Sequence, residues 1–481
     1  MDEGLALIRA AIASAPDDAE AHAQLGRWLS RLHRQPEANA AAERALALGS
    51  RDARTLDTAG VILSRGGRHA RAVECFERAT TLDAGNAGFH FNLASSLKFL
   101  GRFDAAESAY EACLAANPHY WRAHSALSQL RRQTSERNHV ERLRALLDAG
   151  GLDVDAELHL RHALAKELED LGRDDEAFAH LEAGRSRKRA ASRYDFSRDA
   201  ALFEAVTRAT PVPLPPDSAT TDDKPIFVVG MPRTGTTLVE RMLSSHSQVA
   251  SAGESQNFGV LLKRATGTRS PTVLDPATIA CASDVDLAAV GREYVERTRP
   301  AGDKPRFIDK LPLNFFYLAH VARALPGVRI VVLRRHPLDT VVASYRQLFA
   351  TTMPYYQYAY DLRDATRYWL GFDALVAHWR AVLPGRMLEV SYEGLVQQPE
   401  RTLAAVLQHC RLGWEPACLE FERNPDAVAS ASAVQVRRPL YVNSIGRWRR
   451  YEAHLGPAFD VLSAGGMDVE ALRQMHSAGS D

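Results

Sequence analysis

The chain has 481 residues, of which 46% are hydrophobic and 25% charged, and its 59 basic side chains balance 59 acidic ones. This length predicts at least two domains, and the composition is that of globular proteins rather than disordered ones. The zero net charge argues against a protein that binds nucleic acid or an anionic membrane over a broad surface, so any anion site must be local.

The length of the apolar runs and the number and spacing of the cysteines indicate the expected cellular compartment. Runs such as residues 225–231 are far shorter than the about 20 residues that span a bilayer. The chain opens with Met1, Asp2 and Glu3 and continues as an amphipathic helix, unlike a signal peptide. Its five cysteines form no Cys-x-x-Cys pair and are odd in number, which predicts neither a disulfide framework nor a zinc site. We therefore expect a cytoplasmic protein without a membrane span or a bound metal.

Small residues recur every 34 positions in the first part of the chain. The anchors of this pattern are Gly26, Gly60, Ala94 and Ser128. Twelve residues after the first three anchors come Ala38, Ala72 and Ala106. Sixteen residues after the same anchors come Ala42, Phe76 and Tyr110. This period, with small residues where helices cross, is typical of tetratricopeptide repeats, and an off-register copy follows near Ala165. We predict an all-helical solenoid over residues 1–190 that binds a protein or peptide partner or forms a homo-oligomer.

The pattern changes after the repeats. Five prolines fall between residues 211 and 225, so we expect a helix end and a proline-rich linker over residues 191–224. Short apolar or β-branched runs then alternate with helical patterns, at residues 226–229, 306–308, 328–333 and 387–390. This alternation predicts an α/β domain with a central parallel sheet over residues 225–481, and hence an α + α/β chain.

The first predicted strand of this domain runs into a loop bracketed by glycines. Gly230 and Gly235 enclose four residues, and Thr236 and Thr237 open a helix. This is the phosphate-loop spacing G-x-x-x-x-G-K-[ST] with Thr236 in place of the lysine. Backbone N–H groups and the helix dipole still form an anion cradle, and Arg233 offers a two-pronged contact to a terminal phosphate.

The sequence Pro-Arg-Thr-Gly-Thr-Thr at residues 232–237 resembles the 5′-phosphosulfate loop of sulfotransferases, which use 3′-phosphoadenosine 5′-phosphosulfate (PAPS). Within that superfamily the chain resembles the tetratricopeptide-containing bacterial sulfotransferases, whose catalytic domain is similar to tyrosylprotein sulfotransferase. The resemblance covers residues 225–465 and implies a P-loop-like fold, PAPS as co-substrate and no metal. The cofactor ligands that it implies in this loop are Arg233, Thr234, Gly235, Thr236 and Thr237.

Three further segments carry the residues that the resemblance identifies as catalytic. Glu254, after Gly253, matches the general base that takes the proton of a hydroxyl or phenol acceptor. Lys310 follows the predicted strand near residue 307 and would offset charge that grows on the bridging oxygen. Ser432 matches the second residue that contacts the transition state.

Cofactor ligands are also implied beyond the loop. Arg335 follows the strand at 328–333 and matches the arginine that holds the 3′-phosphate. The family serine comes eight residues later, where this chain has Ala343, so Ser344 is the candidate one position further along. Tyr392 matches a tyrosine that contacts the cofactor.

A basic stretch near the C-terminus completes the expected site. Residues 427–451 contain five arginines and no acidic residue, which predicts a flap that faces an anion. The stretch resembles the family segment that covers the cofactor, and we expect Arg438 and Arg447 to bind it.

These features predict a sulfotransferase that moves a sulfuryl group from PAPS to a hydroxyl or phenol. A nucleotide-dependent phosphotransferase is an alternative, but the loop lacks its lysine and the strand at 328–333 ends in arginines rather than in an acidic Mg²⁺ ligand. A repeat-based binding protein with an inactive domain is a third interpretation, against which the retained set Arg233, Glu254, Lys310 and Arg335 argues.

The acceptor stays open at this point. The tyrosylprotein enzymes carry an arginine shortly after the base, where this chain has Ser255, Gln256 and Asn257. Protein tyrosine, a glycan, a lipid and a small molecule all remain candidates.

Overall fold

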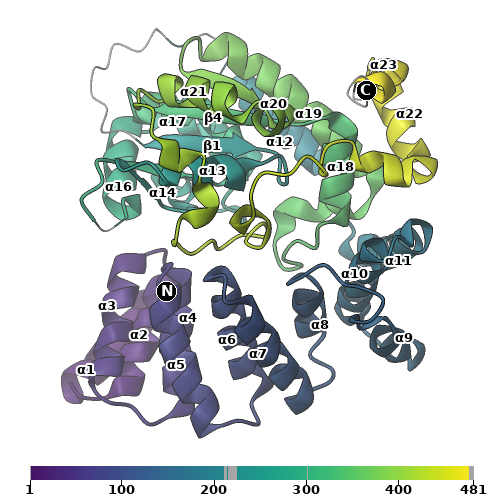
Figure 1. Cartoon of the computed structure of the whole chain (residues 1–481). Helices are drawn as coiled ribbons and strands as arrows, with labels where there is room; N and C mark the ends of the chain where they lie inside the picture. The colour runs from purple at the N-terminus through teal and green to yellow at the C-terminus, as the bar shows by residue number, and fades with distance from the viewer. Residues whose placement is uncertain (1, 211–213, 215–224, 301, 476–481) are drawn as a thin grey trace. The chain divides into compact units, whose positions relative to one another are not determined.

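The computed structural model describes residues 2–210, 214, 225–300 and 302–475 (Figure 1). Most of the proline-rich part of the predicted linker therefore lies outside the described residues. The chain forms two compact units, one of residues 1–171 with 425–437 and one of residues 172–424 with 438–481. The domain boundaries expected at residues 190 and 225 remain a prediction.

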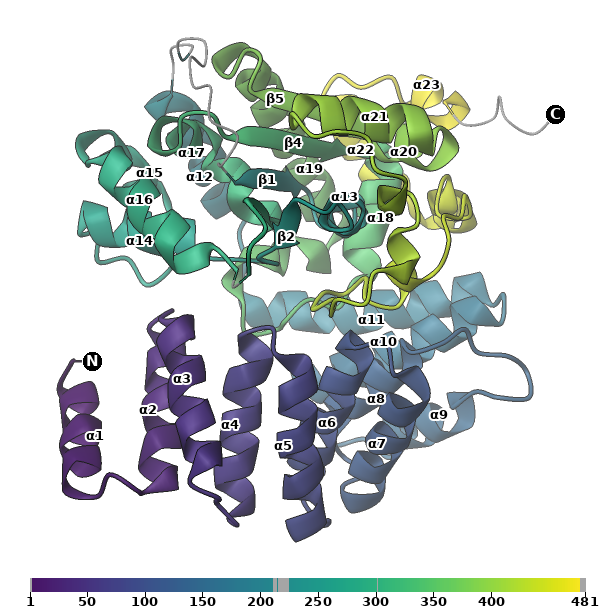
Figure 2. The same cartoon turned by 60° about the vertical axis from the view of Figure 1, so that its left-hand side comes forward.

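The first unit is helical, and its helices run as antiparallel pairs (Figure 2). Its helices are α1 (Asp2–Ser14), α2 (Ala19–Arg31), α3 (Gln35–Ala47), α4 (Ala53–Arg65), α5 (His69–Leu82), α6 (Ala87–Phe99), α7 (Phe103–Ala116), α8 (Trp121–Ser128), α9 (Val140–Asp148) and α10 (Val154–Asp170). The anchor positions lie where paired helices cross. A Cβ atom on Gly60 would lie 2.6 Å from the ring of Phe76, so only glycine lets this aromatic side chain fill the crossing. The predicted 34-residue repeat is thus confirmed.

The second unit is built on a five-stranded sheet in which every strand pair is parallel. Its strands are β1 (Ile226–Gly230), β2 (Val249–Ser251), β3 (Arg306–Asp309), β4 (Arg329–Arg334) and β5 (Met387–Ser391), in the order β2-β3-β1-β4-β5. Four of them match the predicted runs, and the three-residue β2 was not predicted. The expected α/β class with a central parallel sheet is confirmed.

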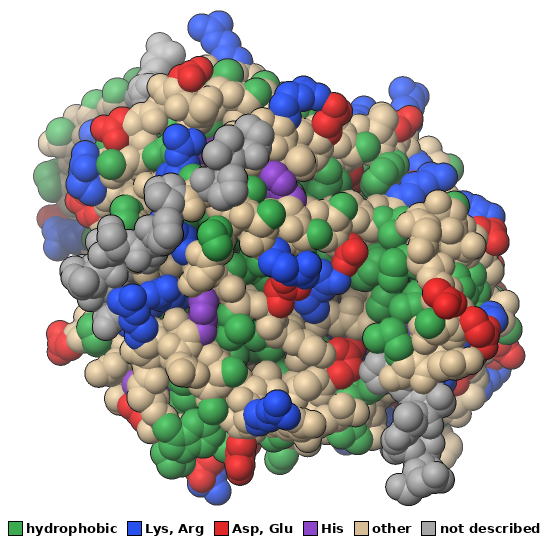
Figure 3. All heavy atoms as spheres, turned by 90° about the horizontal axis from the view of Figure 1, so that it is seen from above, with side chains coloured by type: hydrophobic (Ala, Val, Ile, Leu, Met, Phe, Trp, Pro, Cys, Tyr) green, Lys and Arg blue, Asp and Glu red, His purple; other side chains and the backbone are tan. Residues whose placement is uncertain are grey.

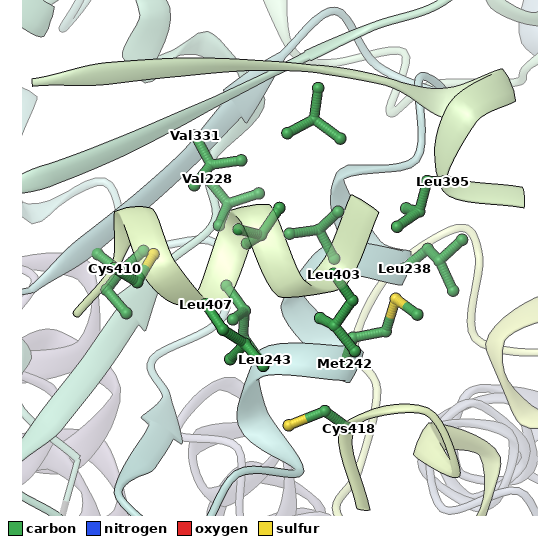
Figure 4. Close-up of a cluster of buried hydrophobic side chains, with 14 of the residues drawn as sticks. Val228, Leu238, Met242, Leu243, Val331, Leu395, Leu403, Leu407, Cys410 and Cys418 are labelled. Atoms are coloured by element: carbon green, nitrogen blue, oxygen red, sulfur yellow. The ribbon is translucent and has the colours of Figure 1, made fainter. Parts of the chain in front are cut away.

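Helices cover both faces of this sheet. On one face, α13 (Thr236–Ser244), α20 (Tyr392–Gln397) and α21 (Pro399–His409) pack on side chains of β1 and β4 such as Val228 and Val331 (Figure 4). On the other, Phe227 of β1 contacts Phe258 of α14 (Asn257–Thr266) and Tyr294 of α16 (Leu287–Thr298). β1 and β4 are therefore buried on both faces, as the apolar residues 226–229 and 330–333 predict.

The remaining helices of this unit are α11 (Asp174–Ser192), α12 (Ser197–Ala209), α15 (Pro276–Cys281), α17 (Leu318–Ala324), α18 (Pro337–Arg346), α19 (Leu362–Val382), α22 (Gly456–Ala464) and α23 (Val469–Gln474). Short 3-10 helices include η2 (Pro312–Phe316), η3 (Pro354–Tyr360) and η7 (Arg447–His454). Within the described ranges, no helix is both long enough and apolar enough to cross a membrane. On the face shown in Figure 3, basic and acidic side chains are interspersed rather than gathered in one patch.

Candidate active site

The loop after β1 has the backbone of an anion cradle. A Cβ atom on Gly230 would lie 2.7 Å from the Leu333 carbonyl oxygen of β4, so the loop leaves the sheet at a point where no side chain fits. Gly235, at the N-terminus of α13, has φ +99°, and a Cβ atom there would lie 2.7 Å from the Tyr392 ring. Between them Arg233 adopts φ +69°, which is unusual for a residue other than glycine. Both bracketing glycines are therefore needed for this path.

Arg335 supports the loop from the end of β4. Its Nη1 donates to the Arg233 carbonyl oxygen at 3.0 Å, and its Nη2 donates to the Ser444 carbonyl oxygen. The guanidinium lies over the Tyr392 ring, 4.7 Å from its centroid. Its Nε is buried and finds no hydrogen-bond acceptor among the described residues. Arg335 thus joins the loop, α20 and the C-terminal segment.

Positive charge is concentrated here. Burial, together with the nearby guanidiniums of Arg335 and Arg346, lowers the pKa of Arg233 to about 10. Burial also raises the pKa of the Tyr392 hydroxyl, against the opposing effect of Arg335. An anion bound at the loop would relieve the repulsion among these arginines. The glycine path, the buried Arg335 Nε and this charge therefore fit a phosphate group.

Asp339, one turn after Arg335 on α18, fastens the C-terminal segment. Its buried carboxylate accepts hydrogen bonds from the backbone N–H groups of Gly446 at 2.7 Å and Trp448 at 3.0 Å. Arg447 lies between these two fixed positions and is half-buried at the start of η7. Asp339 was not predicted as a site residue, although its i, i+4 spacing from Arg335 was a signal.

The other predicted cofactor ligands differ in how far they are exposed to solvent. The hydroxyls of Thr234, Thr236 and Thr237 are buried in the loop and the first turn of α13. Ser344 is also fully buried on α18, near the hydroxyl of Tyr358. Arg438 is exposed. Ser432 belongs to the first unit, packed with the repeats, so its predicted role remains a prediction.

Glu254 and Lys310 form an ion pair beside this loop, at the same end of the sheet. Lys310 Nζ donates to Glu254 Oε1 at 2.5 Å. Backbone pairing continues past the strand ends, because the Lys310 N–H donates to the Gly253 carbonyl oxygen at 2.9 Å. The lysine side chain is 2% exposed and the glutamate side chain 40%, so a buried cation meets an accessible carboxylate.

A third ionisable group meets the same lysine. Glu240 Oε2, from α13, lies 3.4 Å from Lys310 Nζ. Its Oε1 accepts a hydrogen bond from Ser251 Oγ at 2.5 Å. Burial alone would lower the pKa of Lys310, but Glu240 and Glu254 outweigh it and raise that pKa. Glu240 was not predicted, although a charged residue among the apolar positions of α13 was a signal.

Asp309 holds the turn that carries Lys310. Its carboxyl group accepts hydrogen bonds from the Tyr294 hydroxyl at 2.7 Å and the Asn314 amide at 3.1 Å. Burial raises the pKa of Asp309 to about 7. This network ties the end of β3 to α16 and η2, and so fixes where the lysine leaves the sheet.

The family model described as "Sulfotransferase family" matches residues 225–416, which contain the loop, Glu254, Lys310 and Arg335. Residues 225–416 are a sulfotransferase domain. A tetratricopeptide repeat model matches residues 53–86 and 87–120. The chain therefore combines tetratricopeptide repeats with a sulfotransferase domain, as the resemblance predicted.

Known proteins similar to this chain include two curated relatives. An uncharacterized protein of Aquifex aeolicus (strain VF5) is 34% identical over 257 residues, which are 51% of this chain and 33% of that protein. The protein-tyrosine sulfotransferase of Drosophila melanogaster is 25% identical over 239 residues, 46% of each chain. The chain thus spans less than half the length of either relative.

Among solved structures, the sulfotransferase domain of the Synechococcus PCC 7002 olefin synthase is 17% identical to this chain, with a TM-score of 0.34. The match covers 51% of this chain and 95% of that one.

Proposed function

We propose that this chain is a PAPS-dependent sulfotransferase that transfers a sulfuryl group to a hydroxyl or phenol acceptor. The observation that carries the proposal is a juxtaposition at one end of the sheet. A lysine-free phosphate loop follows β1 and is backed by Arg335. At the same end of the sheet, Lys310 follows the neighbouring strand β3 and pairs with Glu254 at 2.5 Å. A phosphotransferase of the P-loop type would instead need a loop lysine and an acidic metal ligand at the end of a strand.

The residues of the loop and its supports would hold the cofactor. Backbone N–H groups from Arg233 to Thr237 and the N-terminus of α13 would bind the 5′-phosphate. Arg335 would bind the 3′-phosphate, and Tyr392 and Arg447 would line the rest of the site. When bound, PAPS supplies a sulfuryl group whose S–O bond to the phosphate breaks as the acceptor oxygen bonds to sulfur.

Glu254 and Lys310 have separate roles in this proposal. Glu254, accessible to solvent, accepts the proton that the acceptor hydroxyl loses. Lys310, buried and protonated, stabilises the negative charge that grows on the leaving phosphate oxygen. The lysine can do so only while it keeps its proton, and the raised pKa of Lys310 supports this role.

The acceptor and the compartment are also proposals. The name of the Drosophila relative makes protein tyrosine the first acceptor to test. The repeats would bind the protein or peptide that carries it. All five cysteines are free, which supports a reducing compartment such as the cytoplasm.

The test is binding of the product 3′-phosphoadenosine 5′-phosphate (PAP) by calorimetry in the presence of a chelator. We expect binding without metal. Arg233→Ala should weaken it by about 1.5–3 kcal/mol, the size of a charge-assisted hydrogen bond. The matched control is Arg292→Ala, which removes an exposed arginine of α16 and should leave affinity unchanged.

Two results would contradict the proposal. One is wild-type protein that does not bind PAP, or binds it only with added metal. The other is transfer of phosphate rather than sulfate to acceptors in a lysate supplied with labelled nucleotide and labelled PAPS.

A further inference from the structure

Lys310 has two carboxylate partners where the proposed chemistry uses one. Glu254 Oε1 is at 2.5 Å and Glu240 Oε2 at 3.4 Å from the same Nζ atom. The two carboxylates differ in environment, because the Glu240 side chain is 11% exposed and that of Glu254 is 40% exposed. Glu240 is therefore the partner shielded from the acceptor side.

Glu240 is itself held in place by the segment that carries the base. The Gly253 N–H donates to Ser251 Oγ at 3.0 Å, and Ser251 Oγ donates to Glu240 Oε1 at 2.5 Å. One oxygen of Glu240 thus faces β2 and the other faces the lysine. This leaves Glu240 fixed from both sides, whereas the Glu254 side chain is held by Lys310 and is 40% exposed on the side from which an acceptor would approach.

The charge count explains why a second carboxylate is useful. When Glu254 takes the acceptor's proton it becomes neutral and no longer balances the ammonium. A buried lysine left with no carboxylate tends to lose its proton, because burial disfavours the charged form. With Glu240 in place, a balanced Glu240–Lys310 pair remains at that moment.

We propose that Glu240 is a positioning residue that keeps the Lys310 ammonium in place while Glu254 takes up the acceptor's proton. This inference rests on the proposed function. Glu240 acts through Lys310 and contacts neither substrate. Among the described residues, the ionisable groups that face Lys310 are Glu240 from α13, Glu254 after β2 and Asp309 at the end of β3.

The test is the pH dependence of PAP binding from pH 7 to above pH 10.5 in wild type and Glu240→Gln. Arg233, whose pKa is about 10, is present in both proteins, so the difference between their curves reports on Lys310. The amide keeps the shape but not the charge, so Lys310 should lose its proton at lower pH. We expect the alkaline loss of affinity to move down by about one pH unit or more, with little change at pH 7. Glu240→Asp keeps the charge and should restore most of the alkaline range.

The control is Glu415→Gln, whose carboxylate pairs with Ser247 rather than with Lys310. It should not move the alkaline limit. An alkaline limit that is the same in Glu240→Gln as in wild type would overturn the inference. If Glu240→Gln does not fold, Ser251→Ala releases Oε1 and should give a smaller shift in the same direction, and no shift would overturn it.

A second readout separates this inference from the proposed function. If wild type does not bind PAP, the proposed function fails, and thermal unfolding still tests the Glu240–Lys310 coupling. In the folded protein the raised pKa of Lys310 means that the coupling stabilises below the unfolded value of 10.5 and is lost as pH rises through the folded value. The loss of melting temperature in Glu240→Gln should therefore be full below pH 10.5 and shrink only as pH rises above that value, and a loss that is the same on both sides of pH 10.5 would overturn the inference.

Discussion

Lys310 and Glu254 are partners in one ion pair, yet they differ in burial, and mutation should separate their roles. Removing the exposed carboxylate leaves Lys310 with Glu240, so the buried charge stays compensated. Removing the lysine instead leaves Glu240, a mostly buried carboxylate, without its cation. Loss of one member of a buried pair is much more destabilising than loss of an exposed one.

We predict that Glu254→Gln lowers single-turnover transfer by roughly 10²- to 10⁴-fold while PAP affinity and stability barely change. Lys310→Ala should lower turnover, weaken cofactor binding and reduce the free energy of unfolding by on the order of 3 kcal/mol. Single-turnover kinetics, calorimetry and urea unfolding measure the three effects. Near wild-type turnover in Glu254→Gln would mean that the base is another residue.

The residues that could be predicted from the sequence are those in a motif of fixed spacing, such as Arg233, Glu254, Lys310 and Arg335. Glu240 could not be, because its meeting with Lys310 depends on how α13 and β3 pack, 70 residues apart in the chain. Tertiary packing, rather than local pattern, assigns it to the site.

At the scale of elements, Asp339 links helix α18 to the C-terminal segment. Its two hydrogen bonds fix residues 446 and 448 on either side of Arg447. His336, the residue before this helix, lies parallel to the Trp448 ring, with centroids 5.8 Å apart. The position of the predicted flap therefore depends on Asp339, an acidic residue of α18 that lies outside the flap in the sequence.

We predict that Asp339→Ala weakens PAP binding by about 1.5–3 kcal/mol, since two charge-assisted hydrogen bonds are lost and Arg447 is no longer held. Amide hydrogen exchange at Gly446 and Trp448 should become faster. Asp286→Ala is the control, because it removes the side-chain cap of α16, a helix that packs on α14 and α17. Unchanged exchange at both amides would contradict the role given to Asp339.

Most helices and strands could be predicted, because the hydrophobic and small residues that form them recur with a regular period in the sequence. The 34-residue period gave the repeat helices, and apolar runs gave four of the strands. β2 has only three residues and no pattern of its own, and it forms because β3 offers it a pairing edge. The short 3-10 helices and the course of residues 425–437 likewise depend on tertiary contacts.

At the scale of the whole molecule, neither unit is a continuous piece of chain. Residues 425–437 pack with the repeats, where the Val428 N–H donates to the Phe99 carbonyl oxygen at 3.0 Å. Conversely α11 and α12, which precede the sheet in sequence, belong to the unit that contains it. A cut at the predicted boundary near residue 225 would therefore remove helices that this unit uses.

Both helices contribute aromatic packing to the second unit. Phe203 of α12 lies 5.0 Å from Phe316 and 5.2 Å from Tyr368, measured between ring centroids. Phe178 of α11 stacks on His454 of η7 at 4.3 Å. η7 begins with Arg447, so α11 packs against the short helix that carries this predicted cofactor ligand.

We predict that a fragment of residues 172–481 is more stable than one of residues 225–481 and binds PAP more tightly. Both fragments lack the repeats on which residues 425–437 pack, so the comparison isolates α11 and α12. In the full chain, Phe203→Ala should cost about 3–5 kcal/mol, the usual range for a buried phenylalanine. Thermal unfolding and calorimetry on the two fragments measure the difference. Equal melting temperatures and equal affinities would show that these helices serve only to connect the repeats to the sulfotransferase domain.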